Sequence, residues 1–348
     1  MIVYAQYGKF LNPTFGSIYR VMALQGIDLR FFRFGFIPRR RGLVYVVFPD
    51  SFVVSPSPFR MAVKVSCFVV SLLFAKLIGC RLVWAINNLR SHEHQYPFVE
   101  RILMKIYIPC VDATIHHSRT SLRECIEKYP ELEQLPTKII PHVNFLHIYP
   151  GRGDRARGTA LLGINEDKSV LLSFGIVRRY KGIVELIESF IRITDPQLRL
   201  VIAGFPLDQE YAEEVRHAAA KDSRVLLLLR EISDTELQDL FAVATLACTN
   251  FSAILNSGSV MLALSLGCPV LTPRLGSLQD VGEAVGADWL KLFDGPLDVK
   301  VLKEAIAWAK APARGASPPL AFANIDVVVA EIVQFLRGII SNPSNERL

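Results

Sequence analysis

Residues 171–182 read LLSFGIVRRYKG, an apolar run followed by a glycine and then by three cationic side chains. A glycine lets the backbone turn tightly, and the first amides of a following helix have no internal partners and point toward a ligand. Cationic side chains add charge-assisted hydrogen bonds to phosphate oxygens. Gly175, Arg178 and Lys181 therefore predict an anion site, with a diphosphate as the ligand. The alternative is an ordinary strand-to-helix turn with arginines and lysine on its surface.

A second segment, residues 256–273, reads NSGSVMLALSLGCPVLTP. Asn256, Ser257, Gly258 and Ser259 precede an apolar helix, Gly267 ends it, and a short strand follows. This is another helix N-terminus at which an anion can bind. The alternative is a plain N-cap with a glycine at the C-terminus of the helix.

The elements expected around these two loops alternate between strand and helix. Between them lie the runs LRLVIAG (198–204) and RVLLLL (224–229), a helix near 208–221, and SDTELQDLFAVA with the capping-box spacing of Ser233 and Glu236. Upstream, strands are expected near 2–6, 29–35, 43–48, 81–86 and 112–116. The polar, glycine-rich residues 151–158 predict a linker or exposed loop, and a last helix is expected near 325–340. The fold class is α/β, with two doubly wound domains.

Composition is compatible with two globular domains and divides the charge unevenly. The chain has 348 residues, of which 51% are hydrophobic and 21% charged. Residues 1–150 hold 18 Lys and Arg against 9 Asp and Glu, a net charge of +9, whereas the remainder holds 21 against 24, a net charge of −3. A basic half is typical of binding to nucleic acid, an anionic membrane or a phosphorylated acceptor. No nucleic-acid motif is present in the sequence.

The six cysteines are scattered, without a CxxC pair or a histidine-rich neighbourhood. This spacing indicates neither a zinc site nor a disulfide framework, and the cytoplasm is the expected compartment. The N-terminal residues MIVYAQYG predict a first strand rather than a signal peptide.

Residues 61–79 are the one stretch to be weighed as a membrane span. Lys64 and Lys76 leave about eleven uninterrupted apolar residues, fewer than the roughly twenty that a span needs. A buried or membrane-surface helix that crosses between two parallel strands is expected instead. Residues 29–42 nearby interleave phenylalanines with arginines, which suits peripheral contact with an anionic membrane. A core strand followed by a solvated turn is the alternative.

These residues together resemble a known family. The order FGxxxxYKG, LVIAG, SDTELQDLF and NSGSxxLALSLGxPVLxP is similar to the donor-binding half of GT-B glycosyltransferases, and within them to the xanthan-type bacterial β-mannosyltransferases. Upstream, VWAINNLRSHE (83–93) resembles that group's "HNLxPHE" segment, and VVFPDSFVV (46–54) its "HWPE" segment. IIPHVNF (139–145) resembles the interdomain "PHG" connection, and Asn12 with Pro13 the "NP" opening of the first helix. The resemblance covers most of residues 1–310.

The resemblance implies a GT-B fold, in which two Rossmann-like doubly wound domains face a cleft. Residues 1–150 would bind the acceptor, residues 151–323 the nucleotide sugar, and residues 324–348 would form a helix that crosses back to the first domain. It implies transfer of a hexose, mannose from GDP-mannose, to a hydroxyl of a lipid-linked oligosaccharide in polysaccharide assembly. The nucleotide sugar is then a substrate, with no separate cofactor. No DxD-type motif requires a metal ion. Localisation would be cytoplasmic, with peripheral contact at the inner face of the membrane.

The resemblance also assigns roles to single residues. Lys181 holds the family's lysine position and would neutralise the diphosphate leaving group, assisted by Arg178. The family-four arginine after the glycine is Ile176 here. The two glutamates of retaining family-four enzymes fall on Ile254 and Leu262, so an inverting reaction is expected.

An inverting reaction needs a base on the acceptor side. Asp50 is the first choice, because it follows the third strand and stands at the glutamate of "HWPE". Glu93, with His92 beside it, is the second, and Asn12 is a further acceptor-side candidate. Each acid could instead be a helix cap or a surface residue. The alternatives for the whole chain are a retaining GT-B transferase with another nucleotide sugar, a nucleotide-sugar epimerase, and a non-catalytic relative that binds a nucleotide sugar.

Overall fold

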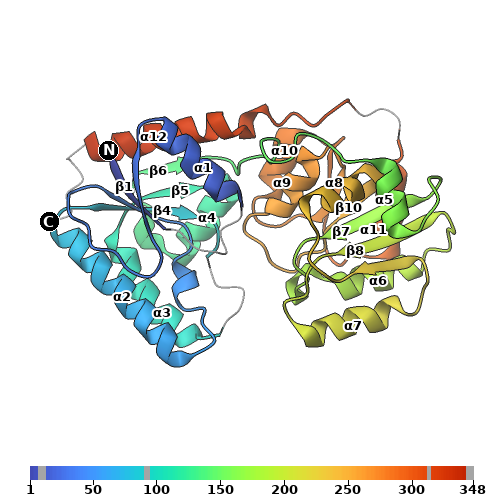
Figure 1. The fold of residues 1–348 in the computed structure, drawn as a ribbon, viewed down its shortest axis with the longest axis horizontal. Helices are drawn as coiled ribbons and strands as arrows, with labels where there is room; N and C mark the ends of the chain where they lie inside the picture. The colour runs from blue at the N-terminus through green and yellow to red at the C-terminus, as the bar shows by residue number, and fades with distance from the viewer. Residues whose placement is uncertain (7–12, 90–94, 312–314, 342–348) are drawn as a thin grey trace. The chain divides into compact units, whose positions relative to one another are not determined.

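The computed structural model describes residues 1–6, 13–89, 95–311 and 315–341. These form two compact units (Figure 1), of which unit 1 comprises Met1–Val143 with the C-terminal segment from Phe322, and unit 2 comprises Asn144–Ala321. These boundaries lie seven residues before the one expected after residue 150 and two residues before the one expected after residue 323.

Unit 1 contains a parallel sheet that, within the described residues, has six strands in the order β2-β1-β3-β4-β5-β6. Alternate residues of β4 face opposite sides: Val83 and Ala85 join the core under α1 and α12, whereas Trp84 packs edge-on against Tyr107 of α3 at 5.4 Å. Figure 1 shows α1 and α12 over one face and α2 and α3 over the other. The elements are β1 (Ile2–Gln6), α1 (Pro13–Leu24), β2 (Asp28–Phe32), β3 (Leu43–Val46), the 3₁₀ turn η1 (Pro49–Phe52), α2 (Pro58–Leu77), β4 (Arg81–Ile86), α3 (Pro97–Tyr107), η2 (Ile108–Cys110), β5 (Val111–His116), α4 (Arg119–Lys128), η3 (Pro130–Leu132), β6 (Thr137–Ile139) and α12 (Ile325–Ser341).

The apolar segment considered as a membrane span is the crossover helix α2 between β3 and β4, which pair in parallel. Its inner side fills the space under the sheet, where Phe68 stacks on Phe52 with ring centroids 4.0 Å apart. The strand expected over 29–35 ends earlier, at Phe32, which pairs with Gln6, the last residue of the neighbouring strand β1. The last helix, α12, contributes to the core of unit 1.

Unit 2 has the same design, and within the described residues its six parallel strands follow the order β12-β11-β10-β7-β8-β9. The capping box expected at Ser233 and Glu236 is confirmed, since each side chain bonds the other's backbone amide. The elements are α5 (Arg155–Leu162), β7 (Ser169–Phe174), the 3₁₀ turn η4 (Arg179–Lys181), α6 (Ile183–Ile191), β8 (Leu198–Ala203), α7 (Gln209–Ala219), β9 (Val225–Leu228), α8 (Asp234–Val243), β10 (Ala244–Cys248), α9 (Gly258–Ser265), β11 (Val270–Pro273), α10 (Leu278–Val285), β12 (Leu290–Phe293), α11 (Val299–Ala309) and η5 (Ala321–Ala323).

The expectation of a linker or exposed loop at 151–158 is wrong for its second half, which begins helix α5. Asp154 caps that helix by accepting a hydrogen bond from the Arg157 amide at 3.0 Å. The carboxylate of Asp239 on α8 accepts two bonds of 2.9 Å from the Arg157 guanidinium. Gly158 is buried where α5 crosses α8, so its lack of a side chain serves close helix packing rather than chain flexibility.

We predict that Gly158→Ala destabilises unit 2. A Cβ at residue 158 would lie 2.3 Å from the carbonyl oxygen of Asp239, so α5 and α8 would have to separate. The expected loss in the free energy of unfolding is roughly 2–4 kcal/mol, measured by urea titration. Gly16→Ala is the matched control, because nothing lies within 4 Å of its added Cβ and the change in helix α1 should stabilise by about 0.5–1 kcal/mol. Equal effects of the two substitutions would contradict this packing role.

Candidate active site

The order of strands in unit 2 reverses between β7 and β10, which are neighbours in the sheet. Loops that follow such neighbouring parallel strands open at the carboxyl edge and leave a crevice, where ligands of open α/β sheets bind. The two loops singled out in the sequence are the ones that follow β7 and β10. The strand order therefore places both loops at the same carboxyl edge of the sheet.

Glycines allow a close backbone approach at this edge. Gly175, directly after β7, has a φ of 85° and donates its amide to the Ala203 carbonyl at 2.9 Å. Gly204, after β8, has a φ of 152°, and a Cβ there would lie 2.1 Å from the carbonyl oxygen of Gly175. A side chain at residue 204 would displace the turn on which the site is built.

The ammonium group of Lys181 is buried at the end of β7. Its Nζ donates to the carbonyl oxygen of Phe174 at 2.9 Å, and the residue is only 9% exposed. Burial, and then the neighbouring Arg178 cation, lower the pKa of Lys181 to about 8. Keeping this group charged at pH 7 costs the unliganded fold on the order of 3 kcal/mol, which an anion bound beside it would offset.

The N-terminus of helix α9 lies at the same edge of the sheet, near Gly175 and Lys181. A Cβ on Gly175 would lie 2.9 Å from Lys181 Nζ and 3.7 Å from Ser259 Oγ, so the missing side chain leaves both polar groups facing one space. Ser257 is buried and its Oγ accepts from the Val260 amide at 3.2 Å, which makes it the N-cap of the helix. Gly258 is the first helical residue, and Asn256 precedes the cap, half-buried. The structure thus brings Gly175, Lys181 and Ser259 together and gives Ser257 a supporting place.

Hydrogen bonds fasten the loop after β10 to the turn after β7. The amide of Ser252 donates to the Tyr180 carbonyl at 2.8 Å, and Asn250 Nδ2 donates to the Gly182 carbonyl at 3.1 Å. Gly182 has a φ of 56°, and a Cβ there would lie 2.4 Å from the carbonyl oxygen of Asn250. The left-handed glycine thus sets the distance between the two loops.

The two arginines of the turn have different surroundings. Arg179 is exposed, makes a bidentate ion pair with Glu214 of α7 at 2.8 Å, and lies over the Tyr211 ring. Arg178 is half-buried, and its charge lowers the pKa of Lys181. Of the two arginines, Arg178 is therefore the one whose charge acts on Lys181.

In unit 1 the order of strands reverses between β1 and β3, and Asp50 lies just past β3 in η1. The buried side chain of Gln6, the last residue of β1, holds this turn: its Oε1 accepts from the amides of Val47 and Phe48, and its Nε2 donates to Ser51 Oγ at 3.0 Å. Asp50 is half-buried at the carboxyl edge, where a ligand of this sheet would bind.

The other acceptor-side candidates, Asn12, His92 and Glu93, lie outside the described residues.

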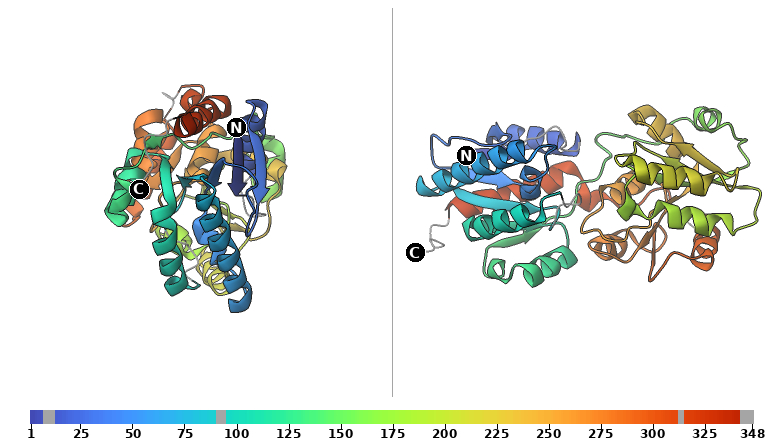
Figure 2. Two further views of the ribbon diagram at one scale, coloured as in Figure 1. Left: turned by 90° about the vertical axis from the view of Figure 1, so that its left-hand side faces the viewer. Right: turned by 90° about the horizontal axis from the view of Figure 1, so that it is seen from below.

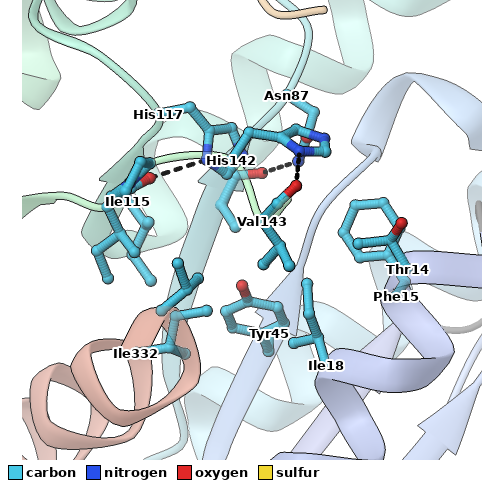
Figure 3. Close-up of a pocket in the computed structure, with 14 residues that line it drawn as sticks. Thr14, Phe15, Ile18, Tyr45, Asn87, Ile115, His117, His142, Val143 and Ile332 are labelled. Carbon is cyan, nitrogen blue, oxygen red and sulfur yellow. Dashed lines mark hydrogen bonds between the residues drawn. The ribbon is translucent and has the colours of Figure 1, made fainter. Parts of the chain in front are cut away.

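Two histidines that the sequence analysis did not select lie further along the same edge (Figure 3). His117 follows β5 and contacts the Ile140 carbonyl through Nδ1 at 3.0 Å, and His142 contacts the Val143 carbonyl at 2.9 Å. Because a carbonyl only accepts, each Nδ1 carries the proton and each Nε2 keeps its lone pair. Burial, and then His142, lower the pKa of His117 to about 3, so its imidazole is neutral at physiological pH.

These histidines line a cavity of about 20 Å³ together with Asn87, which follows β4. That volume holds about one water molecule. His117 Nε2 is buried without a hydrogen-bond partner among the described residues, so it is a further candidate for the base, although its lowered pKa makes it a weaker base than an ordinary histidine. Position alone could have found it, since His117 directly follows the strand expected over 112–116.

Comparison with known proteins agrees with this geometry. Residues 156–309 match the family model of glycosyl transferases group 1. The chain is 26% identical, over 310 residues, to the GDP-mannose:glycolipid 4-beta-D-mannosyltransferase of Xanthomonas campestris pv. campestris, covering 89% of this chain and 83% of that protein.

Two solved structures resemble the whole chain. Sucrose-phosphate synthase from Thermosynechococcus elongatus superimposes with a TM-score of 0.70 at 15% identity, covering 98% of this chain and 99% of that one. HepE from Anabaena, in complex with UDP and glucose, superimposes with a TM-score of 0.64 at 16% identity, covering 99% of both chains.

The family match falls on the unit that carries both loops, and the solved structures superimpose on both Rossmann-like units. Residues 156–309 carry the glycosyl transferases group 1 domain, so the chain is a glycosyltransferase, and its fold is GT-B.

Proposed function

We propose that this glycosyltransferase moves mannose from GDP-mannose to a hydroxyl of a lipid-linked oligosaccharide, with inversion and without a metal ion. The observation that carries the donor half is the buried Lys181 ammonium facing the N-terminus of α9 across Gly175. Cations and amides held in place before the ligand arrives stabilise the charge that develops on a departing diphosphate. The sugar and the glycolipid acceptor are supported by the activity of the Xanthomonas relative.

The proposed step is a single displacement. The acceptor oxygen forms a bond to the anomeric carbon of the sugar while the bond from that carbon to the β-phosphate oxygen breaks. The acceptor proton passes to Asp50, and the electron pair leaves with GDP, whose charge Lys181 and Arg178 meet. Asp50 is supported as the base by its position where the sheet order of unit 1 reverses.

A retaining transferase with another nucleotide sugar is the second candidate, favoured by the UDP in the related HepE structure. The two positions of the family's glutamates hold Ile254 and Leu262, which argues against a retaining reaction. The same absence of acids is what favours the alternative of a non-catalytic relative. Assigning the anomeric configuration of the product by NMR separates inversion from retention. A requirement for an acceptor excludes an epimerase.

The proposed compartment is the cytoplasm, at the inner face of its membrane. All six cysteines lie among the described residues and are free thiols, five of them buried, which suits a reducing environment.

The donor site is tested by thermal stabilisation with GDP, UDP, ADP and dTDP. We expect a shift with GDP equivalent to about 2.7 kcal/mol at a hundred times its Kd. Lys181→Ala should abolish the shift and lower kcat/KM for transfer by at least about a hundredfold, because the diphosphate loses its buried cation. Arg179→Ala is the matched control and should change either quantity less than about twofold, because Glu214 already holds that charge.

Normal transfer kinetics in Lys181→Ala would refute the donor site. A shift with another nucleotide alone would keep the site and change the donor.

Donor binding should also take up a proton above pH 8. The pKa of Lys181 is lowered to about 8 in the unliganded protein, and a diphosphate beside it favours the charged form and raises that pKa. At about pH 8.5 we expect uptake of up to about 0.8 proton per GDP, with affinity falling as the pH rises further. Calorimetry in two buffers of different ionisation enthalpy measures this uptake. Equal uptake by Lys181→Ala would assign the proton to another group.

The base is tested by Asp50→Asn. This variant should lower kcat by at least about a hundredfold, because the acceptor hydroxyl keeps its proton, while GDP binding is unchanged. His117→Gln, assayed in parallel, should have a smaller effect. The reverse ranking of the two variants would make His117 the base in place of Asp50.

A further inference from the structure

Apolar side chains recur along the solvent side of α2, which also exposes Arg60 and Ser66. Phe59, Val63, Val70, Leu73, Phe74 and Leu77 recur at helical spacing and are all exposed, with Val70 at 66%, Phe59 at 77% and Leu77 at 84%. The stripe runs about 27 Å along the helix. We call these six side chains the α2 stripe.

By length and composition α2 is the one helix among the described residues that could span a membrane, yet only 22% of its most apolar window is buried. Its other side is part of the unit 1 fold, since Phe68, Leu72 and Ala75 are fully buried. The helix is therefore a fixed part of the unit and presents a long apolar surface outward. Patches of this kind mark interaction sites.

A basic segment lies along this helix. The Phe36 amide donates to Ser71 Oγ of α2 at 2.9 Å, and Lys64 of α2 lies 5.5 Å from the centre of the Phe34 ring. The same segment carries exposed apolar side chains at Phe34 and Ile37. Its exposed cations are Arg33, Arg39, Arg40 and Arg41. Apolar and cationic side chains therefore alternate beside the α2 stripe.

Helix α3 packs beside α2, as both views of Figure 2 show, and it also exposes apolar and cationic side chains. Phe98 and Ile102 are exposed one turn apart, and Arg101 and Lys105 are exposed one turn apart next to them. Lys76 of α2, in contrast, is paired with Asp112 at 2.6 Å, so its charge is already compensated.

We propose that the α2 stripe, with the basic segment 33–41 and the exposed side of α3, binds the surface of an anionic lipid bilayer. The apolar side chains enter the boundary between headgroups and acyl chains, and the arginines and lysines bind the lipid phosphates. Charge decides between occupants: a second copy of this chain would set the same cations against one another, whereas an anionic bilayer complements them. This proposal rests on the proposed function and extends it. Binding to the bilayer would bring unit 1 to an acceptor that is held in the membrane.

The test is sedimentation of the purified full chain with vesicles of phosphatidylcholine alone or with about 30 mol% phosphatidylglycerol. We expect at least about tenfold tighter binding to the anionic vesicles, weakening as salt is added. The variant Val70→Glu/Leu77→Glu should bind at least about tenfold more weakly, because two charges would have to enter the acyl boundary. Both residues are exposed, so the melting temperature should not change.

Val327→Glu is the matched control, since Val327 is an exposed valine on α12 of the same unit and lies outside the stripe. It should bind within about twofold of the unchanged chain. Undiminished binding by the stripe variant, or no binding of the unchanged chain, overturns the proposal. So does a dimer in sedimentation velocity that the stripe variant converts to monomer without any vesicle binding.

Vesicle binding is measured without nucleotide or acceptor, so its failure is distinct from failure of the proposed function. Transfer to a water-soluble acceptor should be the same in the stripe variant and the unchanged chain.

Discussion

The donor side of this glycosyltransferase depends on one buried charge. An ammonium group with little access to water is unfavourable, and Lys181 is held in that position by its bond to the Phe174 carbonyl and by the tight turn η4. The free-energy cost of burying this charge explains why glycines occupy the backbone around it. Gly175 makes room for the ammonium, and Gly204 keeps the neighbouring strand end close. Each would be strained with a side chain, and each is at the edge where parallel strands deliver their loops.

The same topological rule organises both units. In each sheet the strand order reverses once, between β1 and β3 in unit 1 and between β7 and β10 in unit 2. Strand ends at a reversal are followed by loops that diverge, and polar residues there can face a ligand instead of a packed helix. Asp50 follows one reversal, and the turn of Lys181 and the cap of α9 follow the other. Gln6 in unit 1 and Asn250 in unit 2 serve comparable purposes, because each uses a side-chain amide to fix a loop.

Unit 1 departs from an ordinary doubly wound domain on its outer surface. A crossover helix normally buries its apolar stripe against the sheet and shows polar residues to solvent. Helix α2 is apolar on both sides, and only one side is covered. The net charge of +9 carried by residues 1–150 includes the arginines next to this uncovered side. The proposed contact with an anionic membrane would account for both the exposed phenylalanines and their cationic neighbours.

The sequence by itself determined the alternation of strands and helices, the two loops with Lys181 and Ser259, and the capping box at Ser233. Each follows from local spacing or from one residue's backbone preference, which neighbours along the chain suffice to express. It missed helix α5, because Gly158 looks like a loop residue until Asp239 of α8 is seen packed against it. It also passed over His117 and His142, which nothing in their local pattern marks as a pair.

The sequence analysis selected Arg178, but only the tertiary structure shows how Arg179 differs from it, since the partner that pairs with Arg179 is Glu214, on another helix. The tertiary structure also shows which side of α2 stays exposed. Apolar residues occur on both sides of this helix, so its sequence does not indicate which side packs against the sheet. These features depend on contacts between segments far apart in the chain, and packing, rather than local spacing, decides them.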